Sequence, residues 1–262
     1  MSDSRQRVLR NMLIVMGAFA LSRVLGLVRQ MVFSYYFGAG GEMDAYVAAA
    51  RIPELLFLVV AGGALGSAFI PMFTTRLTQG DTDGAWRLSS AIINLLIVII
   101  LPLSLLAIAL APWLTRVLIA PQFSPELQAQ TTLLLRIMLL SPAIFGVSGI
   151  LMGVLNAHQH FLIPALAPSI YNVVLILGAV WGGRTGAGAL GAAMATVVGA
   201  LAHLLSQVLG LRLFPARYSL TFGRGDGAVR QVLVLMLPRM LGVAAVQFNF
   251  VITNSLASGL GT

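Results

Sequence analysis

AIINLLIVIILPLSLLAIALAPW, residues 91–113, contains no charged residue, and this property sets the fold class of the chain. A helix crosses a bilayer with about 20 mostly apolar residues, so the stretch is long enough to span one. Runs such as Ile97 to Ile100 also favour strands. The length of the stretch and its lack of alternation favour a helix instead. Residues 91–113 therefore predict a membrane-spanning helix.

Six further stretches have a similar length and apolar character, so the sequence predicts an all-α, polytopic membrane helix bundle with about seven transmembrane helices. The predicted spans are residues 12–37, 45–73, 89–113, 131–156, 161–182, 187–211 and 231–258. The basic start and Ala18-Phe19-Ala20 also resemble a signal peptide, but the apolar run continues past them, which favours a retained helix. The linkers are short, so we expect one helical unit.

The composition excludes a soluble enzyme. Of the 262 residues, 58% are hydrophobic and 9% are charged, whereas soluble domains carry roughly 25% charged residues. The absence of cysteine excludes a disulfide scaffold, a thiolate metal site and a cysteine nucleophile. Three histidines with poor spacing do not predict a zinc site, and no phosphate loop, GxSxG or HExxH motif is present. We therefore expect no enzymatic activity, no cofactor and no metal.

The basic residues are distributed as in a membrane protein. All 16 are arginine and the net charge is +8, but they lie at the ends of apolar runs or inside them, which does not predict a nucleic-acid partner. With a cytoplasmic N-terminus, nine arginines fall on the cytoplasmic side: Arg5, Arg7, Arg10, Arg76, Arg87, Arg212, Arg217, Arg224 and Arg230. The opposite side then holds Arg116 and Arg184. This bias predicts a multi-pass protein with its N-terminus inside.

Six charged residues lie within the predicted spans. They are Arg23, Arg29, Arg51, Glu54, Arg136 and Arg239. A charge at a helix centre costs roughly 2.5–3.5 kcal/mol on insertion scales, so these side chains must face protein, a water-filled cavity or the interface. Arg136 is close enough to its span's end to reach the headgroups. Arg239 follows Pro238 and has two readings, a locally paired kink residue or a ligand contact.

The spacing of the other charges leaves two readings open. Arg51 and Glu54 are three residues apart and Asp44 precedes Arg51 by seven, so all three fall on one helical stripe and can form structural ion pairs. The alternative is a ligand-accessible cavity between helices. Arg23 and Arg29 point roughly 120° apart on a regular helix, so they share a cavity only if it is wide or the helix bends.

The excess of buried arginine predicts an anionic ligand. Guanidinium binds phosphate in a bidentate manner and stays charged when buried. If all five arginines count, the set is net cationic by about four, which favours a phosphorylated or carboxylated substrate. Glycine and proline residues interrupt several spans, as in transporters with bent helices, although both residues are common in membrane helices. Gly186, Gly188, Gly191, Ala195 and Gly199 predict close helix packing.

Several stretches resemble one family, the MurJ/MviN lipid II flippases. The first are SRVLGLVR (22–29), FGAG (37–40), MDAYVAAARIP (43–53) and AGGALGSAFIP (61–71). Further along, LLLRIMLLSP (133–142), FLIPALAPSIYN (161–172) and LMLPRMLGVAAVQFNFVITNSLAS (235–258) resemble later segments in the same order. The resemblance covers nearly the whole chain, and the ordered run of motifs is specific.

The resemblance implies a fold of the multidrug/oligosaccharidyl-lipid/polysaccharide exporter type, in which two lobes enclose a cationic cavity. Residues 1–228 resemble a six-helix N-terminal lobe, and residues 229–262 resemble the seventh helix, at the start of a second lobe. Family positions that bind substrate fall on Ser22, Arg23, Arg29, Asp44 and Arg51, and we add Glu54 and Arg239 to this set. Their implied role is to bind the pyrophosphate of lipid II in the bacterial cytoplasmic membrane while the lobes alternate access.

Two departures from the family pattern leave other functions open. Phe57, Leu58 and Gly62 stand where many members carry an arginine pair and a glutamate, and Glu54 replaces a frequent neutral residue. The family has about fourteen spans, so this chain fits a truncated form, a truncated gene product or a half-sized protein that dimerises. The alternatives are an exporter of another polyprenyl-linked sugar, or a non-transporting membrane scaffold of cell-wall assembly. The expected partners are lipid II or a related undecaprenyl-pyrophosphate-linked sugar, membrane lipids, and a second copy or a C-terminal lobe.

Overall fold

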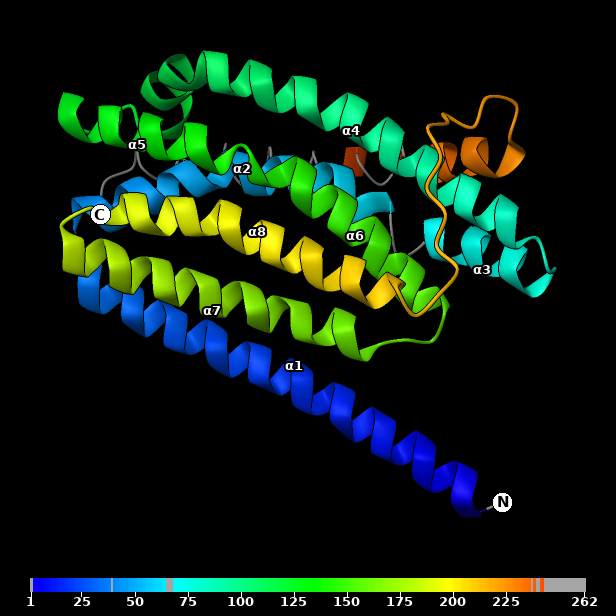
Figure 1. Ribbon diagram of the computed structural model, residues 1–262. Helices are drawn as coiled ribbons and strands as arrows, with labels where there is room; N and C mark the ends of the chain where they lie inside the picture. The colour runs from blue at the N-terminus through cyan, green and yellow to red at the C-terminus, as the bar shows by residue number, and fades with distance from the viewer. Residues whose placement is uncertain (1, 39, 65–67, 237, 239–240, 243–262) are drawn as a thin grey trace.

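The computed structural model describes residues 2–38, 40–64, 68–236, 238 and 241–242, and all regular secondary structure in these ranges is helical (Figure 1). The helices are α1 (Ser2–Phe37), α2 (Gly41–Ala64), α3 (Ile70–Thr78), α4 (Thr82–Trp113), the π-helical turn η2 (Leu114–Ile119), α5 (Pro125–Met138), α6 (Ser141–Ala157), α7 (Leu162–Thr185) and α8 (Ala189–Leu211). A short apolar helix at Gly227–Met236 follows. The predicted all-α membrane bundle is confirmed.

Five helical stretches are long and apolar enough to cross a membrane: Met12–Phe37, Thr82–Ile119, Pro125–Ala157, Leu162–Thr185 and Ala189–Leu211. They correspond to the first, third, fourth, fifth and sixth predicted spans. Helix α2 occupies the second predicted span as far as Ala64, and α3 takes up its end. The seventh predicted span begins in the helix Gly227–Met236 and lies mostly outside the described residues.

Proline divides the fourth predicted span, which the sequence predicts as one helix, into α5 and α6. The α-helical hydrogen-bond pattern is interrupted at Leu139 and Leu140, although their backbone angles stay right-handed helical, just before Pro142 in the first turn of α6. Since proline has no N–H, the Met138 carbonyl loses its usual helical donor four residues on. The Ser141 hydroxyl donates to that carbonyl at 2.7 Å. The break is therefore compensated locally.

A second proline explains the position of Arg136. Pro112 lies inside α4 and leaves the carbonyl of Ile108 without a helical donor. Arg136 Nε on α5 donates to that Ile108 oxygen at 3.3 Å. In a membrane such freed backbone groups need a protein partner. Arg136 thus supplies the Ile108 carbonyl with a donor that Pro112 cannot provide, rather than only reaching for headgroups.

Helices α7 and α8 pack at very short range. A Cβ atom added at Gly178 would lie 2.2 Å from Cβ of Ala195, and one at Gly182 would lie 2.3 Å from the Gly188 oxygen. Neither site has room for a side chain, so the predicted close packing of the sixth span is confirmed. Gly186 differs from that prediction, because it has no atom within 4 Å of a built Cβ and instead ends α7 with a φ of +77°.

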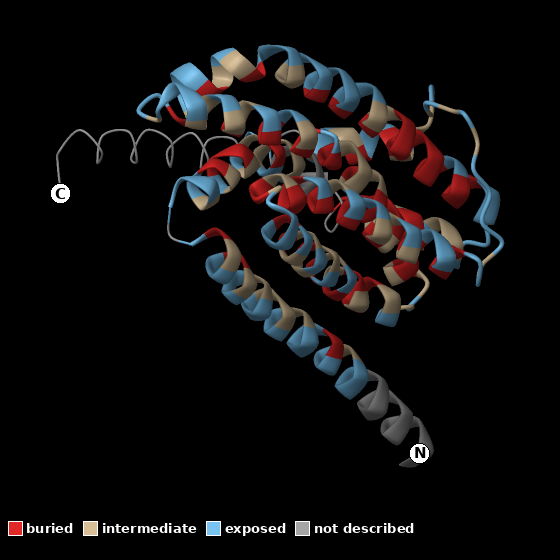
Figure 2. Cartoon of the chain, turned by 60° about the vertical axis from the view of Figure 1, so that its left-hand side comes forward, coloured by how far each residue is buried: buried red, intermediate tan, exposed pale blue. Residues whose placement is uncertain are grey.

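The arrangement places the connections at two opposite ends of the bundle (Figure 1). One end holds the N-terminal part of α1, the α3–α4 and α6–α7 connections and the segment after α8. The other holds the α1–α2, η2–α5 and α7–α8 connections. Helix α1, which packs mainly on α7, is exposed along most of its length (Figure 2). Its exposed residues include the apolar Met12, Met16 and Leu27. The chain alternates between the two ends, as a membrane topology requires.

Candidate functional site

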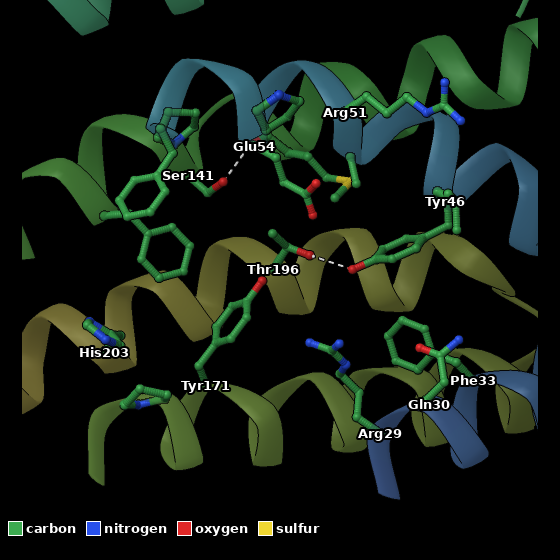
Figure 3. Close-up of a pocket in the computed structure, with 18 of the residues that line it drawn as sticks. Arg29, Gln30, Phe33, Tyr46, Arg51, Glu54, Ser141, Tyr171, Thr196 and His203 are labelled. Carbon is green, nitrogen blue, oxygen red and sulfur yellow. Dashed lines mark hydrogen bonds between the residues drawn. The ribbon is translucent and has the colours of Figure 1, made fainter. Parts of the chain in front are cut away.

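A cavity of about 670 Å³, the central cavity, lies between α1, α2, α6, α7 and α8 (Figure 3). Its charged lining residues are Arg29 from α1 and Arg51 and Glu54 from α2. Its polar lining residues are Gln30, Tyr46, Ser141, Tyr171, Thr196 and His203. Apolar side chains, including Phe57 and Phe145, supply most of the remaining wall. A concave, largely apolar site with a few polar groups is the usual form of a ligand site.

A buried amide fixes Arg29. Arg29 Nη1 donates to Asn172 Oδ1 at 3.2 Å, and Asn172 Nδ2 donates to the Ser22 carbonyl at 3.3 Å. Asn172 lies on α7 and is 7% exposed. Within the described part of the chain it is the only side chain that accepts a hydrogen bond from Arg29. The amide therefore orients the guanidinium and leaves its other N–H groups for a ligand.

A second contact ties α2 to α8 beside the cavity. The Thr196 hydroxyl donates to the Ala192 carbonyl at 3.0 Å. The hydrogen bond between the Tyr46 and Thr196 hydroxyls, 3.2 Å long, must therefore use the proton of Tyr46. The contact holds the helix that carries Arg51 and Glu54 against the bundle.

Glu54 and Arg51 extend in different directions (Figure 3). The Glu54 carboxylate points into the cavity, while Arg51 extends along α2 toward the end where Tyr46 lies. Among the described side chains, the ion pairs are Arg76–Asp226 and Arg217–Asp83, so Arg51 and Glu54 are not within 4.0 Å of each other. The predicted ion-pair stripe is therefore absent here. Asp44, its third member, is exposed and does not line the cavity.

The cavity brings together Arg29, Arg51 and Glu54 but not the other predicted residues. Arg23 is exposed on α1 and lies outside the lining, as the angle of roughly 120° from Arg29 on a regular helix implies. Ser22 contributes its backbone carbonyl to Asn172 and no side chain to the cavity. Arg239 lies outside the described residues. The described lining thus carries two arginines and one glutamate, so the predicted excess of about four positive charges is too high for this cavity.

Sequence reasoning missed the aromatic and hydroxyl residues of the site. Tyr171 and His203 line the cavity, and His203 Nδ1 lies 2.6 Å from the Ser148 hydroxyl. Aromatic residues within an apolar span look like ordinary core residues. One signal was available in Asn172, an amide within a span, since such a group needs a partner. In the described ranges no three His, Asp or Glu residues gather in a way that would hold a metal ion.

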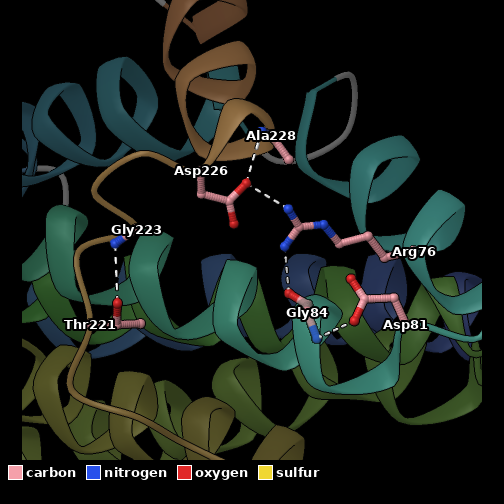
Figure 4. A network of polar contacts seen from close by, with 7 residues as sticks. All are labelled: Arg76, Asp81, Gly84, Thr221, Gly223, Asp226 and Ala228. Carbon is pink, nitrogen blue, oxygen red and sulfur yellow. Dashed lines mark hydrogen bonds and ion pairs between the residues drawn. The ribbon is translucent and has the colours of Figure 1, made fainter.

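A separate polar network fixes the segment after α8 (Figure 4). Arg76 donates to the Gly84 carbonyl at 2.6 Å and pairs with Asp226 at 2.5 Å. Asp81 caps α4 by accepting from the Gly84 amide at 2.9 Å. Partial burial raises the pKa of the Asp226 carboxyl. Hydrogen bonds from Arg76 and the Ala228 amide, together with the charge of Arg76, lower this pKa by more than burial raises it, so it lies below its usual value. The network joins the start of the helix Gly227–Met236 to α3 and α4.

Buried Asn94 on α4 holds the same segment in an extended form. Its Nδ2 donates to the Ser219 and Thr221 carbonyls at 3.2 and 2.7 Å, and its Oδ1 accepts from the Tyr218 hydroxyl. The Ser219 amide donates to Ser90 Oγ at 3.1 Å. These bonds replace the pairing that an extended segment would otherwise find in a sheet. The segment is therefore attached to α4 along most of its length.

Comparisons with known proteins agree on one family. The family model described as lipid II flippase MurJ matches residues 33–262. A lipid II flippase MurJ from Burkholderia cenocepacia is 32% identical, with 96% of this chain and 50% of that protein covered. A probable lipid II flippase MurJ from Rhizobium tropici is 28% identical, with 96% and 48% covered.

Solved structures agree with this result. A lipid II flippase MurJ in an inward closed conformation superposes with a TM-score of 0.74 at 26% identity and covers 92% of this chain and 49% of that one. A MOP superfamily transporter from Pyrococcus furiosus has the same TM-score of 0.74 at 17% identity, which shows the fold alone. The chain spans about half the length of these relatives. With its apolar helices and its match over most of its length, this multi-pass membrane chain belongs to the lipid II flippase MurJ family.

Proposed function

We propose that this chain serves in the translocation of lipid II, the lipid-linked peptidoglycan precursor, across the bacterial cytoplasmic membrane by alternating access. The observation that carries the proposal is the pair Arg29 and Arg51, which line one cavity from two different helices in a chain of this family. Relatives of this chain are named as lipid II flippases. The activity is transport, and the chain has no enzymatic role.

Arg29 and Arg51 bind the pyrophosphate of the head group. A guanidinium donates two parallel hydrogen bonds to phosphate oxygens and keeps its charge in a low-dielectric site. Arg29 is already oriented by Asn172, so little side-chain entropy is lost when the anion binds. Arg51 approaches from α2, so the two cations grip the anion from different walls.

Alternating access requires a second wall that can move against this one. In this proposal, residues 1–228 are a six-helix N-terminal lobe, and residues 229–262 are the seventh transmembrane helix, at the start of a second lobe. That lobe is a C-terminal half or a second copy of this chain. Apolar side chains exposed on the outer face, as along α1, contact the lipid tails of the membrane.

The distribution of arginines supports a cytoplasmic N-terminus. Arg76, Arg212, Arg217 and Arg224 lie in or beside the connections at the end that holds the N-terminal part of α1. Arg116 and Arg184 lie near the connections of the opposite end. Loops rich in arginine remain on the cytoplasmic side of bacterial membranes.

One observation favours a second candidate, an exporter of another polyprenyl-linked sugar. Phe57 lines the cavity at a position where many family members carry an arginine, and Glu54 adds a negative charge. This lining is less cationic than the family pattern implies. A different saccharide on the same diphosphate would fit such a change.

Binding and translocation of lipid II by the reconstituted chain test the proposal. We expect Arg29→Gln with Arg51→Gln to lower lipid II affinity by roughly 100-fold, since a hydrogen bond to a charged group contributes about 1.5–3 kcal/mol. Arg184→Gln, at the far end of α7, is the matched control and should bind as the parent does. Absence of lipid II binding by the parent would refute the proposal. Binding of a different lipid-linked sugar in preference to lipid II would favour the second candidate.

A further inference from the structure

The central cavity has two chemically different ends (Figure 3). Arg51 and Tyr46 lie toward one end, and His203 lies at the other. Thr196 and His203 line the cavity from α8 and are seven residues apart, which corresponds to about 10 Å along a helix. The cavity is therefore at least about 10 Å long beside α8, and Figure 3 places Arg51 at the end opposite His203, so the His203 end suits an uncharged part of a ligand.

Aromatic rings form the wall at the His203 end. The centroid of Phe145 lies 5.2 Å from that of Tyr171, 5.6 Å from that of His203 and 5.6 Å from that of Phe57. The four rings, which we name the aromatic wall, all line the cavity. In contrast, Phe73 is 0% exposed within the core between α3, α4 and α6. Phe57, Phe145 and Tyr171 are half-buried and His203 is 9% exposed, so the aromatic wall is well packed and also borders the cavity.

Tyr171 is built as a platform. A Cβ atom at Gly199 would lie 2.6 Å from Tyr171 Cδ2 and 3.0 Å from Cε2, so the ring lies against the backbone of α8 at a residue without a side chain. The same ring lines the cavity. A flat ring supported from behind is suited to stacking against a flat ligand face.

The polar groups near the aromatic wall suit hydroxyl groups better than a phosphate or a lipid tail. Glu54 points into the cavity, and its carboxylate would repel a phosphate but accepts hydrogen bonds from hydroxyl groups. His203 uses Nδ1 for Ser148, which leaves Nε2 as the second ring nitrogen. A hydrocarbon tail would leave these groups without partners, at a free-energy cost.

We propose that the aromatic wall, with Glu54, binds the pyranose ring attached to the diphosphate of the lipid-linked substrate. The negative face of an aromatic ring attracts the C–H groups on one side of a sugar, while Glu54 accepts from its hydroxyl groups. This inference rests on the proposed function, because the diphosphate bound by Arg29 and Arg51 sets where the sugar lies.

Two lipids that share the undecaprenyl diphosphate group test the inference, because lipid II adds to it a disaccharide that carries a pentapeptide. They are undecaprenyl diphosphate and lipid II, each titrated against the chain in nanodiscs of one lipid composition. We expect the parent to bind lipid II more tightly than undecaprenyl diphosphate. Tyr171→Leu should lower the affinity for lipid II by roughly 3- to 10-fold and leave the affinity for undecaprenyl diphosphate unchanged. Gly199→Ala, which displaces the Tyr171 ring, should act in the same direction.

Controls separate this inference from the proposed function and from misfolding. Arg29→Gln should weaken the binding of both lipids. Phe161 is an exposed aromatic residue outside the central cavity, so Phe161→Leu should change the affinity for neither lipid. Thermal unfolding of each variant reports its folding. If Tyr171→Leu weakens the binding of both lipids equally, or of neither, the sugar site is refuted while the diphosphate site stands. If the parent binds neither lipid, the proposed function itself fails.

Discussion

Replacement of Asn172 by leucine should weaken the binding of diphosphate-linked lipids, although Asn172 does not line the central cavity. The side chain is 7% exposed and bridges Arg29 Nη1 and the Ser22 carbonyl. Leucine has a similar volume and can make neither bond. Arg29 would keep its charge but lose the contact that orients it toward the cavity.

The expected size follows from the bond geometry. A hydrogen bond with a charged partner contributes about 1.5–3 kcal/mol to stability. The Arg29–Asn172 distance of 3.2 Å is at the long end of the range for N–H···O bonds, and Arg29 is partly exposed, so the lower value applies. About 1.5 kcal/mol corresponds to a roughly tenfold loss of affinity. The bond to Ser22 is neutral and should affect stability by about 1 kcal/mol.

The assay is the affinity for undecaprenyl diphosphate in a double-mutant cycle with Arg29→Gln. In the Arg29→Gln background, Asn172→Leu should have no further effect on affinity, since its target is gone. Ser169→Ala is the matched control. Ser169 is buried one turn earlier on α7, and among the described residues its hydroxyl has no hydrogen-bond partner. An equal loss of affinity with and without Arg29 would refute the reasoning, because the amide would then act through packing.

Three further predictions concern stability in detergent. Gly178→Ala should lower the free energy of unfolding by about 1–3 kcal/mol, because its Cβ would lie 2.2 Å from that of Ala195. The control is Gly17→Ala, which has no atom within 4 Å of its Cβ and should leave stability unchanged or raise it. Thermal denaturation measures both variants. The lowered pKa of Asp226 means that its contribution is present above the unfolded-state pKa near 3.8 and is lost as pH falls through the folded-state pKa. The difference in melting temperature between the parent and Asp226→Asn should therefore be constant at neutral pH and vanish on acidification; a difference that grows on acidification would contradict this. Arg136→Leu should destabilise by about 1 kcal/mol by removing the donor to the Ile108 carbonyl, and an unchanged denaturation curve would contradict that role.

The spans could be predicted from the sequence because their length and apolar character are local properties. Residues 91–113 carry no charge, and α4 covers them. The breaks depend on tertiary partners. Pro142 is visible in the sequence, but whether it bends or ends a helix depends on what satisfies the freed carbonyl. Here the Ser141 hydroxyl does so, and two helices result where the apolar pattern predicts one.

The site could be predicted only in part, for a related reason. Helical periodicity separates Arg23 from Arg29 but does not say which one faces inward, since that depends on the position of Asn172 on α7. The spacing of Arg51 and Glu54 allows an ion pair, yet solvation and side-chain entropy often outweigh such a contact. The aromatic wall is invisible in one sequence, because the same rings would serve equally well in a core.

The described lining of the central cavity carries little net positive charge for the diphosphate that we propose it binds. A diphosphate diester carries a negative charge on each phosphate, and anions in a low-dielectric site require nearby compensation. The described lining offers Arg29 and Arg51, but Glu54 offsets one of them. Arg23 is exposed and lies outside this lining. If the proposed diphosphate binds here, its full neutralisation requires cations beyond the described lining. In the sugar site proposed above, Glu54 would accept hydrogen bonds from the saccharide instead of strengthening the hold on the anion.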